Sequence, residues 1–203
     1  MIGTRLSTTL GALILAAALS APADTANTAE AAGNIATTNE FIAKMGMCSQ
    51  CHGSNGAPVR PGIPVIWGQD EAYLLKQMKD FRTKARDVEL MTWAALTIHD
   101  DAEMAAVTGF FSKKTWPAPR AAATKAAATQ RPNGMAVCEA CHQLNFAGGP
   151  TGPRLAGQNY EYLVESMRKF ADGERKNNPE MAQVMATVQP AQREAMARYL
   201  SGL

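Results

Sequence analysis

Apolar residues recur at helical spacing in five segments, and no segment shows the strict alternation of apolar and polar residues that is typical of a half-buried strand. The pattern predicts helices over 38–47, 71–84, 100–112, 159–172 and 190–201. Thr38 or Asn39 can cap the first of them. Segments rich in Gly and Pro, such as 53–64 and 147–153, predict loops between helices. The expected fold class is all-α.

The two halves of the chain repeat short motifs in the same order. The segment 64–69 matches 153–158 at an offset of 89 residues, and both begin with Pro and end with Gly-Gln. A Tyr-Leu pair follows each segment at the same offset. This period is too long for a solenoid repeat. It indicates two tandem copies of one small helical domain.

We expect the chain to divide into three parts. Residues 1–23 form a signal peptide, 24–116 the first domain and 117–203 the second, with a proline-containing linker at 113–120. The alanine-rich segment 121–130 is predicted to be the first helix of the second domain, and the alternative is a flexible extension of the linker.

The expectation of a signal peptide rests on the first residues. One positive charge, Arg5, precedes an apolar run over 10–19 and small residues that end at Ala23. An apolar run of about ten residues is too short to span a bilayer. We therefore expect export to the periplasm and cleavage near Ala23, with membrane contact that is at most peripheral.

Composition narrows the classes of function. Hydrophobic residues make up 46% of the chain and the formal net charge is +2. This composition supports a folded core and does not provide the basic face that nucleic-acid binding requires. The charge is uneven, with nine basic and eleven acidic residues over 24–118 but ten and seven over 119–203. We expect a basic partner to dock on the first half and an acidic partner on the second.

Two Cys-x-x-Cys-His motifs carry the candidate chemistry, at Cys48, Cys51 and His52 and again at Cys138, Cys141 and His142. Residues three apart lie on one face of a helix, so both sulfurs can form thioethers with one porphyrin. The histidine that follows can then ligate the iron. The motifs predict two covalently bound haem c groups.

Three other interpretations of the cysteines are weaker. A zinc ribbon would place its two cysteine pairs closer together than about 90 residues. A thioredoxin-like redox motif needs alternating strands and helices, which the pattern does not show. Two disulfides, common in exported proteins, would give no reason for a histidine after each pair.

The sixth iron ligand is predicted from the repeat. His99 has no counterpart, because the equivalent position in the second half is Gln189. Two methionine pairs do match: Met91 with Met181, expected in loops, and Met78 with Met167, expected inside amphipathic helices. A methionine in an amphipathic helix ordinarily packs in the core, so Met91 and Met181 are the favoured ligands and the helix pair is the alternative.

These motifs resemble the dihaem class I cytochromes c of the cytochrome c4 family over nearly all of the mature chain. The resemblance implies two tandem domains, each a small helical bundle around one covalent haem. It also implies axial ligation by His52 with Met91 and by His142 with Met181. In that family the backbone carbonyl of a proline accepts a hydrogen bond from the ligating imidazole, which carries over to Pro64 and Pro153.

The implied function is electron transfer between redox partners of a respiratory chain, such as a cytochrome bc complex and a terminal oxidase. The linker around Trp116 is also similar to that of the dihaem subunit of flavocytochrome c sulfide dehydrogenases, so an electron-accepting subunit of a flavoprotein dehydrogenase is the alternative. A dihaem peroxidase would lack one methionine ligand or use His99, and the matched methionines argue against it.

Two further pairs of residues have expected roles. Trp67 and Trp93 are expected to pack against haem. Arg86 and Arg175 match across the repeat, and they are expected either to pair with haem propionates or to lie on a solvated basic face.

Overall fold

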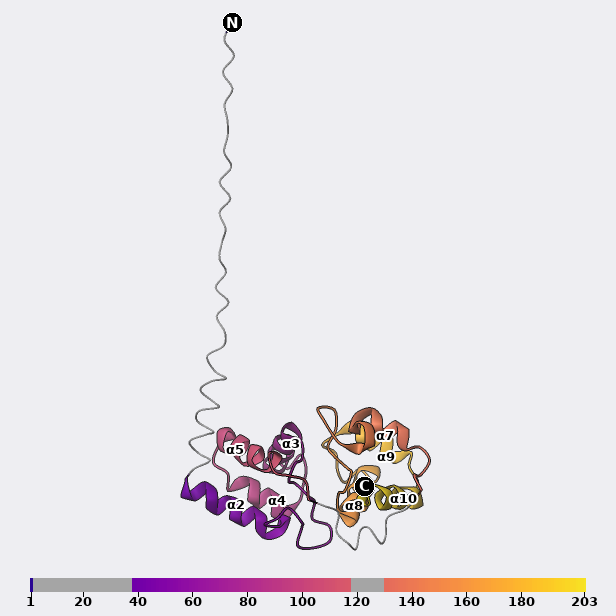
Figure 1. Cartoon of the computed structure of the whole chain (residues 1–203), viewed down its shortest axis with the longest axis horizontal. Helices are drawn as coiled ribbons and strands as arrows, with labels where there is room; N and C mark the ends of the chain where they lie inside the picture. Colours follow the sequence, from indigo (N-terminus) through magenta and orange to yellow (C-terminus); the bar gives the residue numbers. More distant parts are fainter. Residues whose placement is uncertain (2–37, 118–129) are drawn as a thin grey trace.

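The computed structural model describes residues 38–117 and 130–203, besides Met1, and contains two helical bundles joined by the linker (Figure 1). The predicted signal peptide and nearly all of segment 121–130 lie outside the described residues. Among the described residues there is no strand, only an isolated bridge between Gly149 and Gly152. The all-α expectation is confirmed.

The four α-helices of the first bundle correspond one to one with the four α-helices of the second, and η1 has no counterpart. The first bundle contains α2 (Asn39–His52), α3 (Glu71–Arg82), α4 (Glu89–Leu96) and α5 (Asp101–Ser112). The second contains α7 (Met135–His142), the short 3-10 helix η1 (Leu144–Phe146), α8 (Tyr160–Ala171), α9 (Pro179–Ala186) and α10 (Pro190–Ser201). All five predicted helices are present, and the first continues through the Cys-x-x-Cys-His motif.

Polar side chains fix the helix starts. The Thr38 hydroxyl accepts a hydrogen bond from the amide of Phe41, which begins α2 as predicted. Asp70 caps α3 and its repeat counterpart Asn159 caps α8, each by accepting from the amide three residues on, at 2.8 and 2.9 Å. The repeat therefore preserves capping chemistry as well as apolar spacing.

Met91 and Met181 lie in helices, so the prediction that they occupy loops is wrong. Each is the third residue of an eight-residue helix, α4 or α9. Pro179 supplies a preset backbone angle at the start of α9. The negative charge of Glu89 at the start of α4 interacts favourably with the positive end of the helix dipole. Helices this short gain their stability from packing, which local sequence signals do not report.

Each bundle has its own apolar core. Helix α3 contacts α4 and α5, and α8 likewise contacts α9 and α10. The first core contains Phe41, Met45, Leu74, Ile98, Met104, Val107 and Phe111. The second contains Met135, Phe146, Leu163, Met167, Phe170, Met185, Met196 and Leu200, among others. The two-copy organisation that the repeat predicts thus corresponds to two separate packing units.

Two glutamines join the bundles reciprocally. The side-chain amide of Gln158 accepts from the Val65 backbone N–H at 2.7 Å and donates to the Val65 carbonyl at 3.0 Å. Gln69 makes the same pair of bonds with the backbone of Arg154, at 2.8 and 3.0 Å. Each partner is the other's repeat equivalent, so the contact has approximate two-fold symmetry.

The linker packs into this junction through Trp116. A Cβ added to Gly68 would lie 2.9 Å from the Lys114 carbonyl oxygen, and one added to Gly157 would lie 3.0 Å from the Trp116 indole nitrogen. Both glycines have positive φ, so glycine is needed for backbone angle and for close approach. No helix in the described part of the chain is long and apolar enough to cross a membrane.

Candidate haem centres

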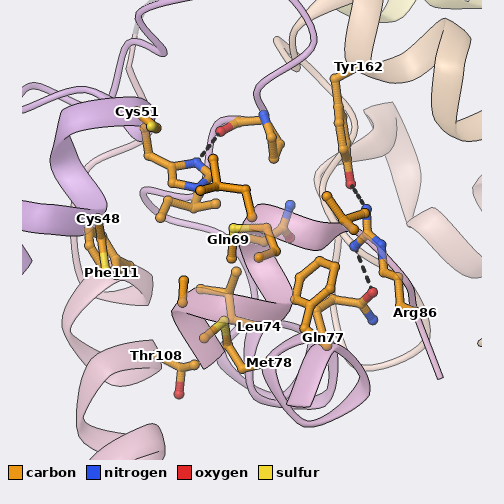
Figure 2. Close-up of a pocket in the computed structure, with 18 of the residues that line it drawn as sticks. Cys48, Cys51, Gln69, Leu74, Gln77, Met78, Arg86, Thr108, Phe111 and Tyr162 are labelled. Carbon is orange, nitrogen blue, oxygen red and sulfur yellow. Dashed lines mark hydrogen bonds between the residues drawn. The ribbon is translucent and has the colours of Figure 1, made fainter. Parts of the chain in front are cut away.

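A cavity of about 720 Å³ opens beside the end of α2 in the first bundle. Its lining includes Cys48, Cys51 and His52, and further side chains come from α3, α4 and α5. Figure 2 shows Cys48 and Cys51 on one side of this cavity and Met78 with Leu74 on another. The volume is within the usual range for bound cofactors.

The imidazole of His52 is buried and held in one orientation. Its Nδ1 lies 2.9 Å from the Pro64 carbonyl oxygen. Because a carbonyl can only accept, Nδ1 carries the proton and Nε2 keeps a free lone pair. Burial lowers the pKa of His52, partly opposed by this hydrogen bond, so the ring is held in the neutral form that binds metals.

The second bundle repeats this geometry in a cavity of about 540 Å³ that contains Cys138, Cys141 and His142. Nδ1 of His142 lies 2.8 Å from the Pro153 carbonyl oxygen. The loop reaches the imidazole because residue 152 is glycine: a Cβ there would lie 3.1 Å from Nδ1. Burial lowers the pKa of His142 as it does that of His52.

The four cysteines are free thiols, one pair in each cavity. Burial raises the pKa of Cys48 to about 11 and also raises that of Cys138. Because the pairs line different cavities, they do not form a four-cysteine zinc site. The disulfide and zinc interpretations therefore have no support in the geometry of these side chains.

Both methionine pairs reach the cavities. Met91 and Met78 line the first cavity, and Met181 and Met167 line the second. Met167 is also a buried member of the second core. His99, the ligand expected of a peroxidase, is exposed beside Glu40 and lines neither cavity.

Each cavity thus offers two thiols, a neutral imidazole with one free nitrogen, methionine thioether sulfurs and largely apolar walls. Thiols can form thioethers with a porphyrin, and imidazole and thioether are axial ligands of cytochrome c iron. The residues present fit a covalently attached haem in each bundle.

Comparison with known proteins identifies the family of this chain. The family model described as cytochrome c matches residues 121–203. Cytochrome c4 of Pseudomonas aeruginosa is 30% identical over 187 residues, which cover 86% of this chain and 91% of the relative. The chain belongs to the cytochrome c4 family.

Two further similarities extend the comparison. The crystal structure of reduced recombinant cytochrome c4 from Pseudomonas stutzeri matches with a TM-score of 0.66 at 27% identity, covering 80% of this chain and 98% of that one. A thiosulfate dehydrogenase electron acceptor from Stutzerimonas stutzeri is 30% identical over 172 residues, covering 77% of this chain and 78% of the relative. The expected fold, two tandem class I cytochrome c units, is confirmed.

As a cytochrome c4 this protein transfers electrons and is not an enzyme. It carries two covalently bound haem c groups, and it acts with redox-partner proteins.

The positions of the two tryptophans and the exposure of the two arginines differ in part from those expected. Trp93 lines the first cavity, but Trp67 is not among the lining residues and packs against the first core, with Lys114 over its ring. Arg175 is buried and Arg86 is half-buried, so the prediction of a solvated basic face is wrong.

The two arginines instead reach across the bundle junction. Arg86 donates to the Tyr162 hydroxyl at 3.2 Å, and Arg175 donates to the Tyr73 hydroxyl at 3.4 Å. Both also donate to the side-chain oxygen of Gln77, and Figure 2 shows Arg86 between Tyr162 and Gln77. Tyr73, Tyr162 and Arg175 line both cavities. The only sequence signal for this cluster was the repeat match of its two tyrosines and of its two arginines, because Gln77 corresponds to Ser166.

Proposed function

We propose that each bundle binds one haem through the residues that the sequence predicts. The thioether cysteines are Cys48 and Cys51 in the first bundle and Cys138 and Cys141 in the second. The axial pairs are His52 with Met91 and His142 with Met181. The observation that carries this assignment is the neutral imidazole, fixed by a proline carbonyl, in a cavity that Met91 or Met181 also lines.

When bound, each haem supplies a one-electron couple. Pro64 and Pro153 orient the ligating rings, because each carbonyl holds Nδ1–H and directs Nε2 into the cavity. A neutral sulfur ligand and apolar walls disfavour the extra positive charge of the oxidised iron, and so raise the reduction potential. His52 and His142 end α2 and α7, and Met91 and Met181 lie on α4 and α9, so helices would position all four ligands of the bound haems.

The location and the domain limits belong to the same proposal. The signal-like segment 1–23 supports export to the periplasm with cleavage near Ala23. The first domain spans 24–116 and the second 117–203, with membrane contact at most peripheral. A haem attached through two thiols also suits an exported protein, because the thioethers hold it without cellular resupply.

The protein shuttles electrons between a cytochrome bc complex or a dehydrogenase and a terminal oxidase. The second candidate is an electron-accepting subunit of a flavoprotein dehydrogenase such as a sulfide dehydrogenase. One observation supports the general role of a dehydrogenase subunit: a similar chain is named as the electron acceptor of a thiosulfate dehydrogenase. Isolation of the native protein under mild conditions separates the two, because a subunit co-purifies with a flavoprotein in fixed ratio and a free shuttle does not.

The ligand assignment is tested by alanine substitution. Met91→Ala and Met181→Ala should each remove about half of the far-red absorption band of ferric Met–His haem. Met78→Ala and Met167→Ala are the matched controls, because these side chains line the same cavities from α3 and α8. Loss of the band in the control variants and not in the first pair would overturn the assignment.

The attachment sites are tested by mass. Replacing Cys138 and Cys141 with Ser should leave one covalent haem, carried by a peptide that contains Cys48 and Cys51. Two covalent haems in that variant would show that the second pair is not an attachment site.

A further inference from the structure

The chain segment just before α9 is hydrogen-bonded to the first bundle through Asn177. Its Nδ2 donates to Asp80 Oδ2 at 2.6 Å and to Gln77 Oε1 at 3.0 Å, and both acceptors lie on α3. The Lys76 ammonium, about one turn before Asp80, donates to the backbone carbonyl of Asn177 at 2.9 Å. We call these three bonds the Asn177 contact. Because one acceptor is a half-buried carboxylate, the contact includes a charge-assisted bond, which is stronger than a neutral one.

The neighbouring Arg175 fixes the orientation of this side chain. Its Nε donates to Asn177 Oδ1 at 3.0 Å. A guanidinium only donates and a carboxylate only accepts, so the Asn177 amide between them has a single orientation. Arg175 is itself buried and donates to Gln77 and Tyr73 of α3. Residues 175–177 are therefore attached to the first bundle as one unit.

The Asn177 contact lies directly beside the start of α9. The next residue, Asn178, caps that helix by accepting a hydrogen bond from the Met181 amide at 2.7 Å. A helix of eight residues depends on its cap and on packing for its position. Asn177 and Asp80 line neither cavity, so they would act on a haem centre only through the placement of α9.

The first bundle lacks the equivalent contact. The position that corresponds to Asn177, 90 residues earlier, is Asp87, whose side chain is exposed and has no donor. The counterpart of Asp80, 89 residues on, is Lys169, which pairs with Glu165 of its own bundle. The two halves therefore differ in the residues that would place the methionine helix.

The start of α4 differs in the same way. Val88 occupies its cap position and makes no side-chain hydrogen bond there. From the segment 83–88, one hydrogen bond reaches the second bundle within the described part of the chain, from Arg86 to the Tyr162 hydroxyl. The helix that carries Met91 is thus placed mainly by its own bundle.

We propose that Asn177 and Asp80 are positioning residues for Met181, so that the first bundle holds the sixth ligand of the second iron in place. This inference rests on the proposed ligation by Met181. A thioether is a soft, neutral donor and binds ferric iron weakly, so its bond depends on how firmly the chain holds the sulfur. Loss of an outer contact that orients a ligand typically changes affinity by about 10–100-fold. Met91 has no such contact with the other bundle.

The test replaces the amide donor without changing its size. Asn177→Asp keeps an acceptor for Arg175 but sets a carboxylate against Asp80, and aspartate is the residue that the first bundle has at the equivalent position. Adding Asp80→Asn to this variant returns a donor and an acceptor to the contact. The control is Asp172→Asn, because Asp172 is exposed and pairs with Arg168 of its own bundle.

The probe is imidazole, which replaces methionine on ferric haem, and the far-red band of Met–His haem reports the replacement. Met91→Ala and Met181→Ala assign the two kinetic phases, because each variant retains one methionine-ligated iron. In the Asn177→Asp holo-protein the phase of the second iron should be about tenfold faster or more. The phase of the first iron should stay within about twofold. Adding Asp80→Asn should return the faster phase to within about threefold of wild type, and Asp172→Asn should change neither phase.

Three results would overturn the proposal. The first is an unchanged phase of the second iron in Asn177→Asp. The second is equal acceleration of both phases, which would report a general loosening of the fold. The third is an accelerated phase that Asp80→Asn does not slow, which would place the effect of residue 177 within its own bundle. Two methionine-replacement phases in Met181→Ala would instead refute the ligation by Met181, and the inference with it.

Discussion

Removing the Gln158 side chain should open the junction between the bundles at one defined point. Gln158→Ala deletes two hydrogen bonds to the backbone of Val65, and both residues are buried. The N–H and carbonyl of Val65 would then lose their partners. A net hydrogen bond contributes about 1 kcal/mol, and an unsatisfied buried group costs about 1–3 kcal/mol. We therefore expect local opening at Val65 to become easier by roughly 2–4 kcal/mol.

Native-state hydrogen exchange of the holo-protein measures this opening directly. The expected change corresponds to an increase in the Val65 amide exchange rate of between about 30-fold and 1,000-fold. The Thr92 amide, which bonds to the Val88 carbonyl within α4, is the internal reference and should not change. Gln69→Ala is the matched control, because it should accelerate exchange at Arg154 and not at Val65.

Two outcomes would refute this reasoning. An unchanged Val65 amide in Gln158→Ala would show that the glutamine bonds do not hold the junction. Equal acceleration of Val65 and Thr92 would show that the substitution destabilises the whole first bundle, so that the loss is not local to the contact.

Three further predictions follow from single contacts. The pKa of Glu103 is lowered, because hydrogen bonds from Lys44 and from a backbone amide outweigh the effect of burial. The ionised carboxylate therefore contributes to the free energy of unfolding above its ordinary pKa of 4.5, and this contribution is lost as pH falls through the lower folded value. Glu103→Gln should lower the free energy of unfolding by about 1–2 kcal/mol at pH 7, and urea unfolding of the variant should depend less on pH in the acid range. Trp116→Ala should lower the free energy of unfolding by about 2 kcal/mol and make the linker easier to cleave by protease. Trp116→Phe should do neither, because the buried indole N–H has no hydrogen-bond partner within the described residues and its loss removes no bond. Lys84→Gly should raise the melting temperature, with a gain of about 1 kcal/mol, because Lys84 has a φ of 60° where the second bundle has Gly173 at 71°; a lower melting temperature would contradict it.

The local sequence was sufficient for the four 12-residue helices and for the presence of two covalent haems. Apolar spacing and capping residues define α3, α5, α8 and α10 to within two residues of the predicted ends. The attachment motif determines its own geometry, because residues three apart share a helix face and the histidine follows directly. The histidine–proline hydrogen bonds were expected from the family resemblance and are present in both bundles.

Local sequence signals were less informative about the methionine that is proposed as the second axial ligand. The repeat match left two methionine pairs, and Met91 and Met181 were favoured over Met78 and Met167 because they were predicted in loops, whereas both lie in helices. Short helices depend on tertiary packing more than on intrinsic propensity, so the pattern did not reveal them. Met78 and Met167 also line the cavities, so the alanine substitutions of the four methionines decide which pair ligates iron.

The contacts between the bundles were decided by tertiary structure alone. The repeat showed that Gln69 corresponds to Gln158 and Arg86 to Arg175, but correspondence does not imply proximity. Their partners lie in the other half of the chain, and no periodicity or capping rule connects residues so distant in sequence. Burial of a polar side chain depends on which surfaces meet, because only that meeting excludes water. The sequence by itself therefore determined two haem-binding helical units. The packing of one unit against the other determined which of their polar residues are buried in the contact between the two cavities.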